Sequence, residues 1–262
     1  MTMLAERVLP LSGIHNFRDY GGYAVEGGGR LRGGILWRSA HHVEATPEDL
    51  AAVDALGLET IVDLRGDDER EVHPCRRSEN FSARVLFAGG QTAGLAPHLQ
   101  AAGGAIDNET ARARMIDTYA GMPYRPALVA TLRLYLAALS EYDAPSLVHC
   151  VAGKDRTGLA VAVVHRLLGV HEDDLMQDYL LTNSAGKIDE RIAQGASQIR
   201  ARYGGEIHDD AIRTLMSVNP AFLDAALATI RRDHGDVATY AEAVLNLTPE
   251  MHEAMVDKLV IY

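Results

Sequence analysis

The chain has 262 residues, of which 47% are hydrophobic, and a formal net charge of −11. A chain of this length and hydrophobic content is able to bury one sizeable core, so we expect a single domain over residues 1–262. The excess of acidic residues excludes a general nucleic-acid-binding protein and a protein held at anionic membranes, because most of its surface repels phosphate groups.

The first part of the chain alternates between strand-like and helix-like segments. Residues 16–38 mix short aromatic or β-branched stretches with glycine clusters, which predicts a twisted hairpin or a pair of short strands. A helix is predicted from the capping residue Thr46 to a stop at Gly57. Residues 60–65 and 83–87 are short apolar segments typical of buried strands. This alternation predicts an α/β fold of three layers, with a central, mainly parallel sheet flanked by helices.

The middle and the end of the chain are predicted to be mostly helical. Residues 88–110 are rich in glycine and small residues, so we expect a mobile loop there. A strand over 146–150 separates a predicted helix at about 126–141 from an almost wholly apolar helix at 157–170, which belongs in the centre of the fold. Beyond His171, caps and glycine stops indicate four further helices, over residues 172–183, 187–203, 219–235 and 248–259.

Cys150 ends the predicted strand and begins a loop, HCVAGKDRTG, that runs into the central helix. The N–H groups of such a loop and the helix dipole create a site for an anion. They also stabilise a thiolate, so we expect the pKa of the Cys150 thiol to fall and its sulfur to be nucleophilic at neutral pH. Arg156 is able to bind two phosphoryl oxygens through its planar guanidinium. Thr157 is able to donate its hydroxyl to the sulfur and so ease its departure from phosphorus.

The loop resembles a known family signature. A cysteine, five residues, an arginine and a threonine, preceded by His149, are typical of the cysteine-dependent protein tyrosine phosphatase superfamily, and HCVAGKDRTG closely resembles the loop of its bacterial and fungal tyrosine phosphatase family branch. The resemblance continues through NFRDYGG, GRLRGGILWRSA, IVDLRGDDE, DYLLTN and YAEAVLNLTPEMHEAMVDKL, so it covers nearly the whole chain. It implies a phosphatase fold and a phosphocysteine intermediate, with no cofactor and no metal.

The resemblance also implies how the site is built. The phosphate group is expected to bind the loop formed by Val151, Ala152, Gly153, Lys154, Asp155 and Arg156. His149 and Arg38 are expected to support this loop, although Arg38 also fits a structural ion-pair set with Arg18 and Asp19. Residues of about 172–215 are expected to form a helical lid over the site, followed by C-terminal helices over about 219–262.

Two aspartates are candidates for the general acid that protonates the leaving oxygen. Asp155 lies in the loop, and the resemblance suggests that a loop aspartate serves this branch. Its neighbours Lys154 and Arg156 should depress its pKa until a phosphate dianion neutralises them. Asp63 ends the predicted strand at 60–65, and such strand ends face the same crevice. Its other interpretation is a salt bridge with an arginine, so Asp155 is favoured.

The segment 187–203 has two interpretations. Ile188, Ile192, Ala196 and Ile199 fall on one face, with the basic side chains Lys187, Arg191, Arg200 and Arg202 elsewhere. The helix is either an ordinary surface helix packed on the core or part of a lid whose apolar face covers Cys150.

The substrate class stays open between two phosphoesters. Relatives of this branch act on phosphotyrosine, sometimes on phosphoserine or phosphothreonine, and on phosphoinositides. We expect a phosphorylated protein, with a phosphoinositide or another small phosphoester as the alternative. Lipid phosphatases of the superfamily often carry a lysine at the position of Lys154, but Val151 occupies a position where some inositide-specific relatives carry a second lysine. Phosphate analogues such as vanadate are expected to inhibit. A phosphate-binding module without turnover is the alternative of another class.

The remaining polar residues carry weaker signals. Cys75 is a bystander rather than a disulfide partner of Cys150, and two cysteines in such different settings indicate a reducing compartment. His41 and His42 are interpreted as surface residues, because adjacent histidines face different directions and no third metal ligand follows. No signal-peptide pattern and no membrane-spanning apolar run occur, so we expect a cytoplasmic protein without stable membrane insertion, with export by another route left open.

Overall fold

The computed structural model describes residues 7–90, 107–203 and 207–262. Its strands are β1 (Arg18–Asp19), β2 (Arg30–Leu31), β3 (Leu36–Ser39), β4 (Thr60–Asp63), β5 (Arg84–Leu86), β6 (Ser146–His149) and β7 (Val260–Ile261). Its first helices are α1 (Pro47–Asp54), α2 (Asp67–Val72), α4 (Asn108–Ala120), the 3₁₀ turn η2 (Met122–Tyr124), α5 (Pro126–Glu141) and α6 (Asp155–Leu167). The others are α7 (Glu172–Ala185), α8 (Ile188–Tyr203), α9 (Asp209–Met216), α10 (Pro220–His234), α11 (Val237–Leu245) and α12 (Pro249–Leu259).

The central sheet has the strand order β1-β3-β6-β4-β5. Strands β3, β6, β4 and β5 are parallel, and only β1 is antiparallel to its neighbour β3. In this register His149 of β6 pairs with Ser39 of β3 on one side and with Asp63 of β4 on the other. The segments that follow these three strands therefore leave the sheet at one edge, and Cys150 is the first residue beyond β6. The predicted α/β fold with a mainly parallel sheet is confirmed.

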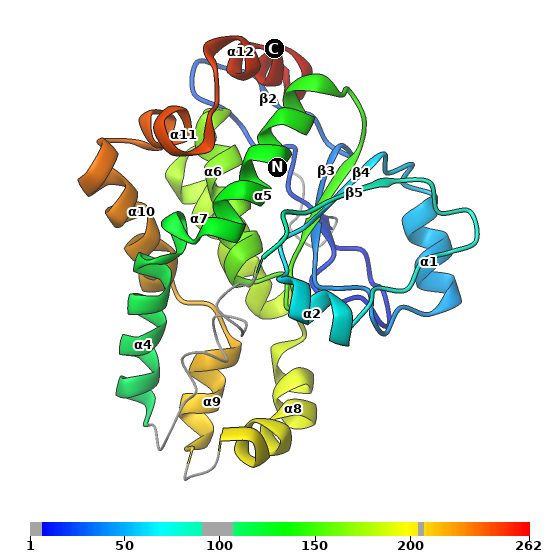
Figure 1. Cartoon of the computed structure of the whole chain (residues 1–262), viewed down its shortest axis with the longest axis vertical. Helices are drawn as coiled ribbons and strands as arrows, with labels where there is room; N and C mark the ends of the chain where they lie inside the picture. The colour runs from blue at the N-terminus through cyan, green and yellow to red at the C-terminus, as the bar shows by residue number, and fades with distance from the viewer. Residues whose placement is uncertain (1–6, 91–106, 204–206) are drawn as a thin grey trace.

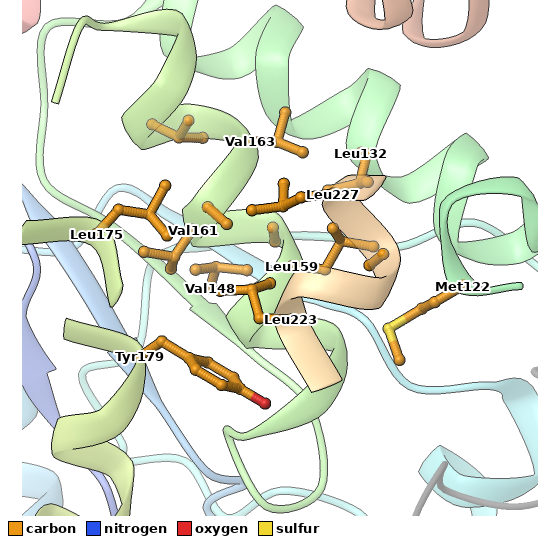
Figure 2. Close-up of a cluster of buried hydrophobic side chains, with 14 of the residues drawn as sticks. Met122, Leu132, Val148, Leu159, Val161, Val163, Leu175, Tyr179, Leu223 and Leu227 are labelled. Carbon is orange, nitrogen blue, oxygen red and sulfur yellow. The ribbon is translucent and has the colours of Figure 1, made fainter. Parts of the chain in front are cut away.

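Alternate residues of the central strands pack into two separate cores. Leu36, Val62 and Val148 join the larger core with the helices, whereas Trp37, Ile61 and Leu147 join a smaller core with α1 and the N-terminal segment. This alternation follows from the period of two along a strand, and it gives the three layers that the sequence predicts. Figure 2 shows Val148 of β6 among Leu159 and Val161 of α6 and Leu223 of α10, so the strand before the loop and the helix after it share one core.

Helix α6 lies at the centre of the helical layer, where nearly every one of its side chains is buried. Helices α4, α8 and α9 project beyond the carboxyl ends of the parallel strands, at the bottom of Figure 1. There α9 packs on both α4 and α8. The amphipathic helices that were predicted beyond His171 are present as α7, α8, α10 and α12. None of the helices in the described ranges is long and apolar enough to span a bilayer.

The structure adds a long-range strand pairing to the sequence prediction and changes the end of one predicted loop. Within the predicted hairpin region 16–38, β1 pairs antiparallel with β3, and β2 is bonded locally to residues 22–24. Strand β2 also pairs with β7 near the C-terminus, a partner that the local sequence pattern does not reveal. Of the predicted loop 88–110, residues 91–106 lie outside the described part of the structure. Its last residues belong instead to α4, because Asp107 caps that helix by accepting a hydrogen bond from the N–H of Thr110.

Candidate active site

The loop from Cys150 to Lys154 joins β6 to α6, as the sequence predicts. Cys150 lies at its base with 2% of its surface exposed. The loop carbonyls are turned away from the site: the oxygen of Val151 accepts from the N–H of His41, and that of Gly153 accepts from Asn16 Nδ2 at 2.7 Å and from Arg38 Nη2 at 3.0 Å. The carbonyls of Val151 and Gly153 are therefore bound from outside the loop, which favours N–H groups that face inward, as the predicted anion cradle requires.

Gly153 is required by the loop geometry. Its φ of 63° lies in the left-handed region, and a Cβ there would stand 2.3 Å from the carbonyl oxygen of Ser39. Any other residue would therefore suffer both backbone strain and a collision with β3. This close approach explains the glycine in the middle of HCVAGKDRTG.

Arg156, in the first turn of α6, is held by an acidic side chain that the sequence prediction missed. Glu69 of α2 accepts hydrogen bonds from both Nη1 and Nη2 of Arg156, the second at 2.9 Å, and the carbonyl of Leu64 accepts another from Nη1 at 3.1 Å. Burial alone would lower the pKa of Arg156, but the hydrogen bonds from Arg156 to Glu69 and the charge of Cys150 raise it well above the ordinary value. The guanidinium is therefore permanently charged and fixed in orientation.

A buried ion-pair cluster supports the back of the loop. Asp178 of α7 binds both Arg18 and Arg38, and all three side chains are fully buried. Burial alone would raise the pKa of Asp178, but the two guanidinium charges hold it well below its usual range. The cluster carries two positive charges against one negative charge, and Arg38 bonds directly to Gly153, so its excess positive charge lies behind the anion cradle.

The predicted ion-pair set of Arg18, Asp19 and Arg38 is therefore arranged differently from the sequence interpretation. Asp19 accepts hydrogen bonds from the backbone N–H groups of Gly21 and Gly34 instead of pairing with Arg38. The acidic partner comes from DYLLTN, one of the blocks that carry the family resemblance.

Asp155 begins α6 inside a buried hydrogen-bond chain. Tyr119 donates to Asp155 Oδ1 at 2.8 Å, and Tyr179 donates to the hydroxyl of Tyr119 at 2.8 Å. Burial, together with the charge of Asp155, raises the pKa of Tyr119 well above its usual range, so this tyrosine stays a neutral donor. Gly158 makes room for the chain, because a Cβ there would lie 2.9 Å from the ring of Tyr179.

Lys154 is buried with 1% of its surface exposed. Its Nζ donates to the carbonyls of Leu215 and Ser217, at the end of α9, and lies 3.3 Å from Asp155 Oδ1. Burial lowers the pKa of Lys154, although the charge of Asp155 opposes this shift. Lys154 thus ties the loop to α9 in this arrangement, rather than lying on a solvated loop shoulder.

Asp63 forms a salt bridge with Arg65, two residues further along the chain. Arg65 binds both carboxylate oxygens, with Nε at 2.9 Å from Oδ1 and Nη2 at 2.7 Å from Oδ2. Burial alone would raise the pKa of Asp63, but His149 and Arg65 hold it well below its usual range. Asp63 is therefore an ionised ion-pair partner at neutral pH and a poor proton donor.

His149 and Thr157 flank the loop in the core. Nδ1 of His149 donates to the carbonyl of Cys150 at 3.2 Å, and the ring stacks on His42 at 5.6 Å between centroids. Oγ1 of Thr157 is buried and has no hydrogen-bond partner within the described ranges, so its predicted donation to the Cys150 sulfur stays a prediction. His42 is 1% exposed, so its interpretation as a surface residue is wrong: the ring fills the space between Phe17 and His149.

Cys75 is closer to the site than the sequence suggests. Its sulfur, a carboxylate oxygen of Asp63 and a ring nitrogen of His149 lie within 4.8 Å of one another, a donor set of the kind that binds transition metals. Arg65 already occupies this group, since its Nη2 lies 3.2 Å from the Cys75 sulfur and also binds Asp63. The guanidinium neutralises the acidic donors, so the cluster is better described as an ion-pair network.

The buried histidines predict acid sensitivity of the fold. Burial, opposed by Asp63, lowers the pKa of His149 from 6.5 to about 4, so the unfolded chain binds a proton between these pH values that the folded chain does not. The free energy of unfolding should therefore fall as the pH drops below 6.5, by about 2 kcal/mol from this residue between pH 6.5 and 5. Urea unfolding at several pH values should show this loss reduced in His149→Asn. Exposed His171→Asn should keep the wild-type slope; equal slopes in all three proteins would contradict the assignment.

Comparison with known proteins identifies the family to which the chain belongs. The sequence pattern of the tyrosine phosphatase family matches residues 9–261. The chain belongs to this family. It is 33% identical over 240 residues to a provisionally named tyrosine-protein phosphatase of Cupriavidus necator, over 89% of this chain and 82% of that protein. The family resemblance inferred from HCVAGKDRTG is thereby confirmed, and the chain is a cysteine-based phosphatase.

Other proteins are also similar to this chain. The chain is 28% identical over 267 residues to the triple specificity protein phosphatase PtpB of Mycobacterium tuberculosis, over 90% of this chain and 93% of PtpB. Among solved structures, P. aeruginosa TpbA matches 74% of this chain and 96% of its own, with 18% identity and a TM-score of 0.35. A TpbA variant in complex with phosphotyrosine matches 70% and 86%, with 19% identity and a TM-score of 0.32.

Proposed function

We propose that this phosphatase hydrolyses phosphotyrosine in proteins, and also phosphoserine or phosphothreonine, with Cys150 as nucleophile. The observation that carries the proposal is the fixed pair of Cys150 and Arg156, one at the base of the anion cradle and the other held across it by Glu69. PtpB, a triple specificity protein phosphatase, supports a protein substrate with more than one acceptor residue.

The proposed reaction has two steps. The Cys150 thiolate attacks phosphorus and forms an S–P bond while the ester P–O bond breaks, and an aspartic acid gives its proton to the leaving oxygen. Water then attacks the phosphocysteine, the carboxylate removes a proton from it, and the thiolate leaves with inorganic phosphate as product. The loop N–H groups of residues 151–156 and the guanidinium of Arg156 stabilise the equatorial oxygens in both steps.

We assign the proton transfer to Asp155 rather than Asp63. Asp155 opens α6 directly after the loop and is oriented by Tyr119, whereas Asp63 is bound on both oxygens by Arg65. Asp155→Asn should lower kcat about 100-fold on an alkyl phosphoester, and much less on an ester whose leaving group is a weak base. Asp63→Asn is the matched control and should show no dependence on the leaving group. A leaving-group dependence found only in Asp63→Asn would reverse the assignment.

A phosphoinositide or another small phosphoester is the second candidate substrate. Lys154 favours it by its residue type, but its Nζ is bound to the carbonyls of Leu215 and Ser217 and is turned toward α9 in this arrangement. Recognition of a phosphoinositide by Lys154 would require these hydrogen bonds to break so that Nζ reaches the headgroup. We therefore propose a protein substrate before a lipid.

The test is a comparison of initial rates without added metal on a phosphotyrosine peptide, a phosphoserine peptide and short-chain phosphoinositides, each with and without vanadate. We expect the highest kcat/KM on the phosphotyrosine peptide and inhibition by vanadate. A preference for the inositides would make lipid the substrate. Tight vanadate binding without turnover on any ester would identify a phosphate-binding module instead.

Two further assignments are proposals of the same kind. Residues of about 172–215, which include α7, α8 and α9, are proposed as a lid over the site. The position of α8 and α9 beyond the carboxyl ends of the parallel strands supports this assignment (Figure 1). A reducing, cytoplasmic location is supported by the free thiols of Cys75 and Cys150.

A further inference from the structure

The first turn of α8 lies next to the phosphate-binding loop. Asn16 connects the two, because its N–H donates to the carbonyl of Ala185 at the end of α7 and its Nδ2 donates to the carbonyl of Gly153 at 2.7 Å. Helix α8 begins at Ile188, three residues after Ala185, and the side chain of Ile188 is 5% exposed. The start of α8 is therefore anchored against the same groups that hold the loop.

Arg191 lies three residues after Ile188, so the two side chains share one side of the helix. Its Nη1 is buried and has no hydrogen-bond partner in the part of the chain that the structure describes. Burial lowers the pKa of Arg191, while the charges of Asp155 and Cys150 oppose this shift. The sequence pattern had placed Arg191 away from the apolar face, but the helix turns it inward.

The other cations at the loop have acidic partners of their own. Arg156 is bound by Glu69, Lys154 lies 3.3 Å from Asp155, and both bonds are buried or nearly so. Arg191 makes no ion pair with any residue in the described ranges. A buried charged N–H donor without an acceptor costs free energy, so the retention of Nη1 in this position calls for an anion that binds next to it.

We propose that Arg191 is a substrate-binding residue that donates its Nη1 to the phosphoryl group held in the loop. The proposal rests on the function proposed above and adds α8 to the site. A phosphate dianion over the Cys150 thiolate brings three negative charges to the loop, where Arg156 is already shared with Glu69 and Lys154 with Asp155, so a further guanidinium would strengthen binding of the anion. In this proposal the first turn of α8 contacts the substrate's phosphate through Arg191.

The test compares three variants of the full chain with the wild type. Arg191→Met removes the charge at similar volume, Arg191→Lys keeps the charge without the fork, and Arg200→Met removes an exposed arginine of the same helix that pairs with Asp209. Binding of orthovanadate is measured by calorimetry, and kcat and KM are measured separately on p-nitrophenyl phosphate and on a phosphotyrosine peptide.

We expect Arg191→Met to weaken vanadate binding at least 10-fold and to raise KM similarly, Arg191→Lys to recover part of both, and Arg200→Met to stay within about 2-fold of the wild type. Vanadate binding equal to wild type in folded Arg191→Met would overturn the proposal. If Arg191→Met does not fold, full vanadate affinity in Arg191→Lys combined with a lower melting temperature would overturn it as well, because it would assign Arg191 a structural role.

The outcomes separate this proposal from the proposed function. A wild-type protein that binds vanadate but hydrolyses no ester contradicts the function, yet the binding series still decides whether Arg191 contacts the anion. A wild-type protein that hydrolyses esters with all three variants unchanged contradicts the Arg191 proposal alone. Failure of the wild type to bind vanadate at all contradicts both.

Discussion

Replacing Cys150 with serine should lower turnover at least about a thousandfold while the protein still binds phosphate analogues. A serine hydroxyl is not ionised at neutral pH, so it lacks the thiolate that the loop N–H groups and the α6 dipole stabilise. The loop is held by hydrogen bonds from Asn16 and Arg38 to the carbonyl of Gly153, and neither bond involves the Cys150 side chain. Steady-state rates and vanadate calorimetry on the same preparation measure the two effects separately.

The matched control is Cys75→Ser. The Cys75 sulfur accepts hydrogen bonds from Arg65 and from the N–H of His42 and lies within 4.8 Å of a ring nitrogen of His149. The variant therefore disturbs the surroundings of the site but leaves the nucleophile in place. It should retain turnover within about 10-fold of the wild type. Appreciable turnover by Cys150→Ser, or an equal loss in both variants, would contradict a phosphocysteine mechanism.

The part of the site that is local in the chain was predictable from the sequence. Cys150, Gly153 and Arg156 lie within seven residues, between a strand and a helix whose apolar patterns are clear, so their arrangement follows from the β6–loop–α6 connection alone. The parallel sheet was predictable for the same reason, because short apolar segments alternate with a capped helix.

The groups that hold the loop were not predictable in this way. Glu69, Tyr119 and Asp178 come from three different helices, and no spacing in the sequence links them to Cys150. Helix α2, which carries Glu69, has no buried residue and therefore no amphipathic pattern to reveal it. A charged side chain buried by a distant partner looks in the sequence like any surface charge, which is also why His42 was placed on the surface.

Arg156→Lys should lower kcat/KM about 100- to 1,000-fold while the fold is retained. Glu69 takes one edge of the guanidinium with two hydrogen bonds and the carbonyl of Leu64 takes a third, and the proposed mechanism adds the phosphoryl oxygens as further acceptors. An ammonium group is a point charge with three donors and no planar fork, so it cannot meet Glu69 and two equatorial oxygens in one plane. Urea unfolding of the same variant distinguishes the loss of a contact with substrate, which leaves the free energy of unfolding unchanged, from the loss of the folded structure.

Glu69→Gln is the companion variant that tests how this arginine acts. The amide still accepts one hydrogen bond from Arg156 but no longer neutralises it, so ground-state binding of vanadate should be kept or strengthened while kcat falls about 10-fold because the fork is less well oriented. This split is expected only if Glu69 positions Arg156 for the transition state. If kcat and vanadate affinity fell together in Glu69→Gln, the carboxylate would instead be holding the loop and α2 in place, and the loss in Arg156→Lys would then include that structural contribution.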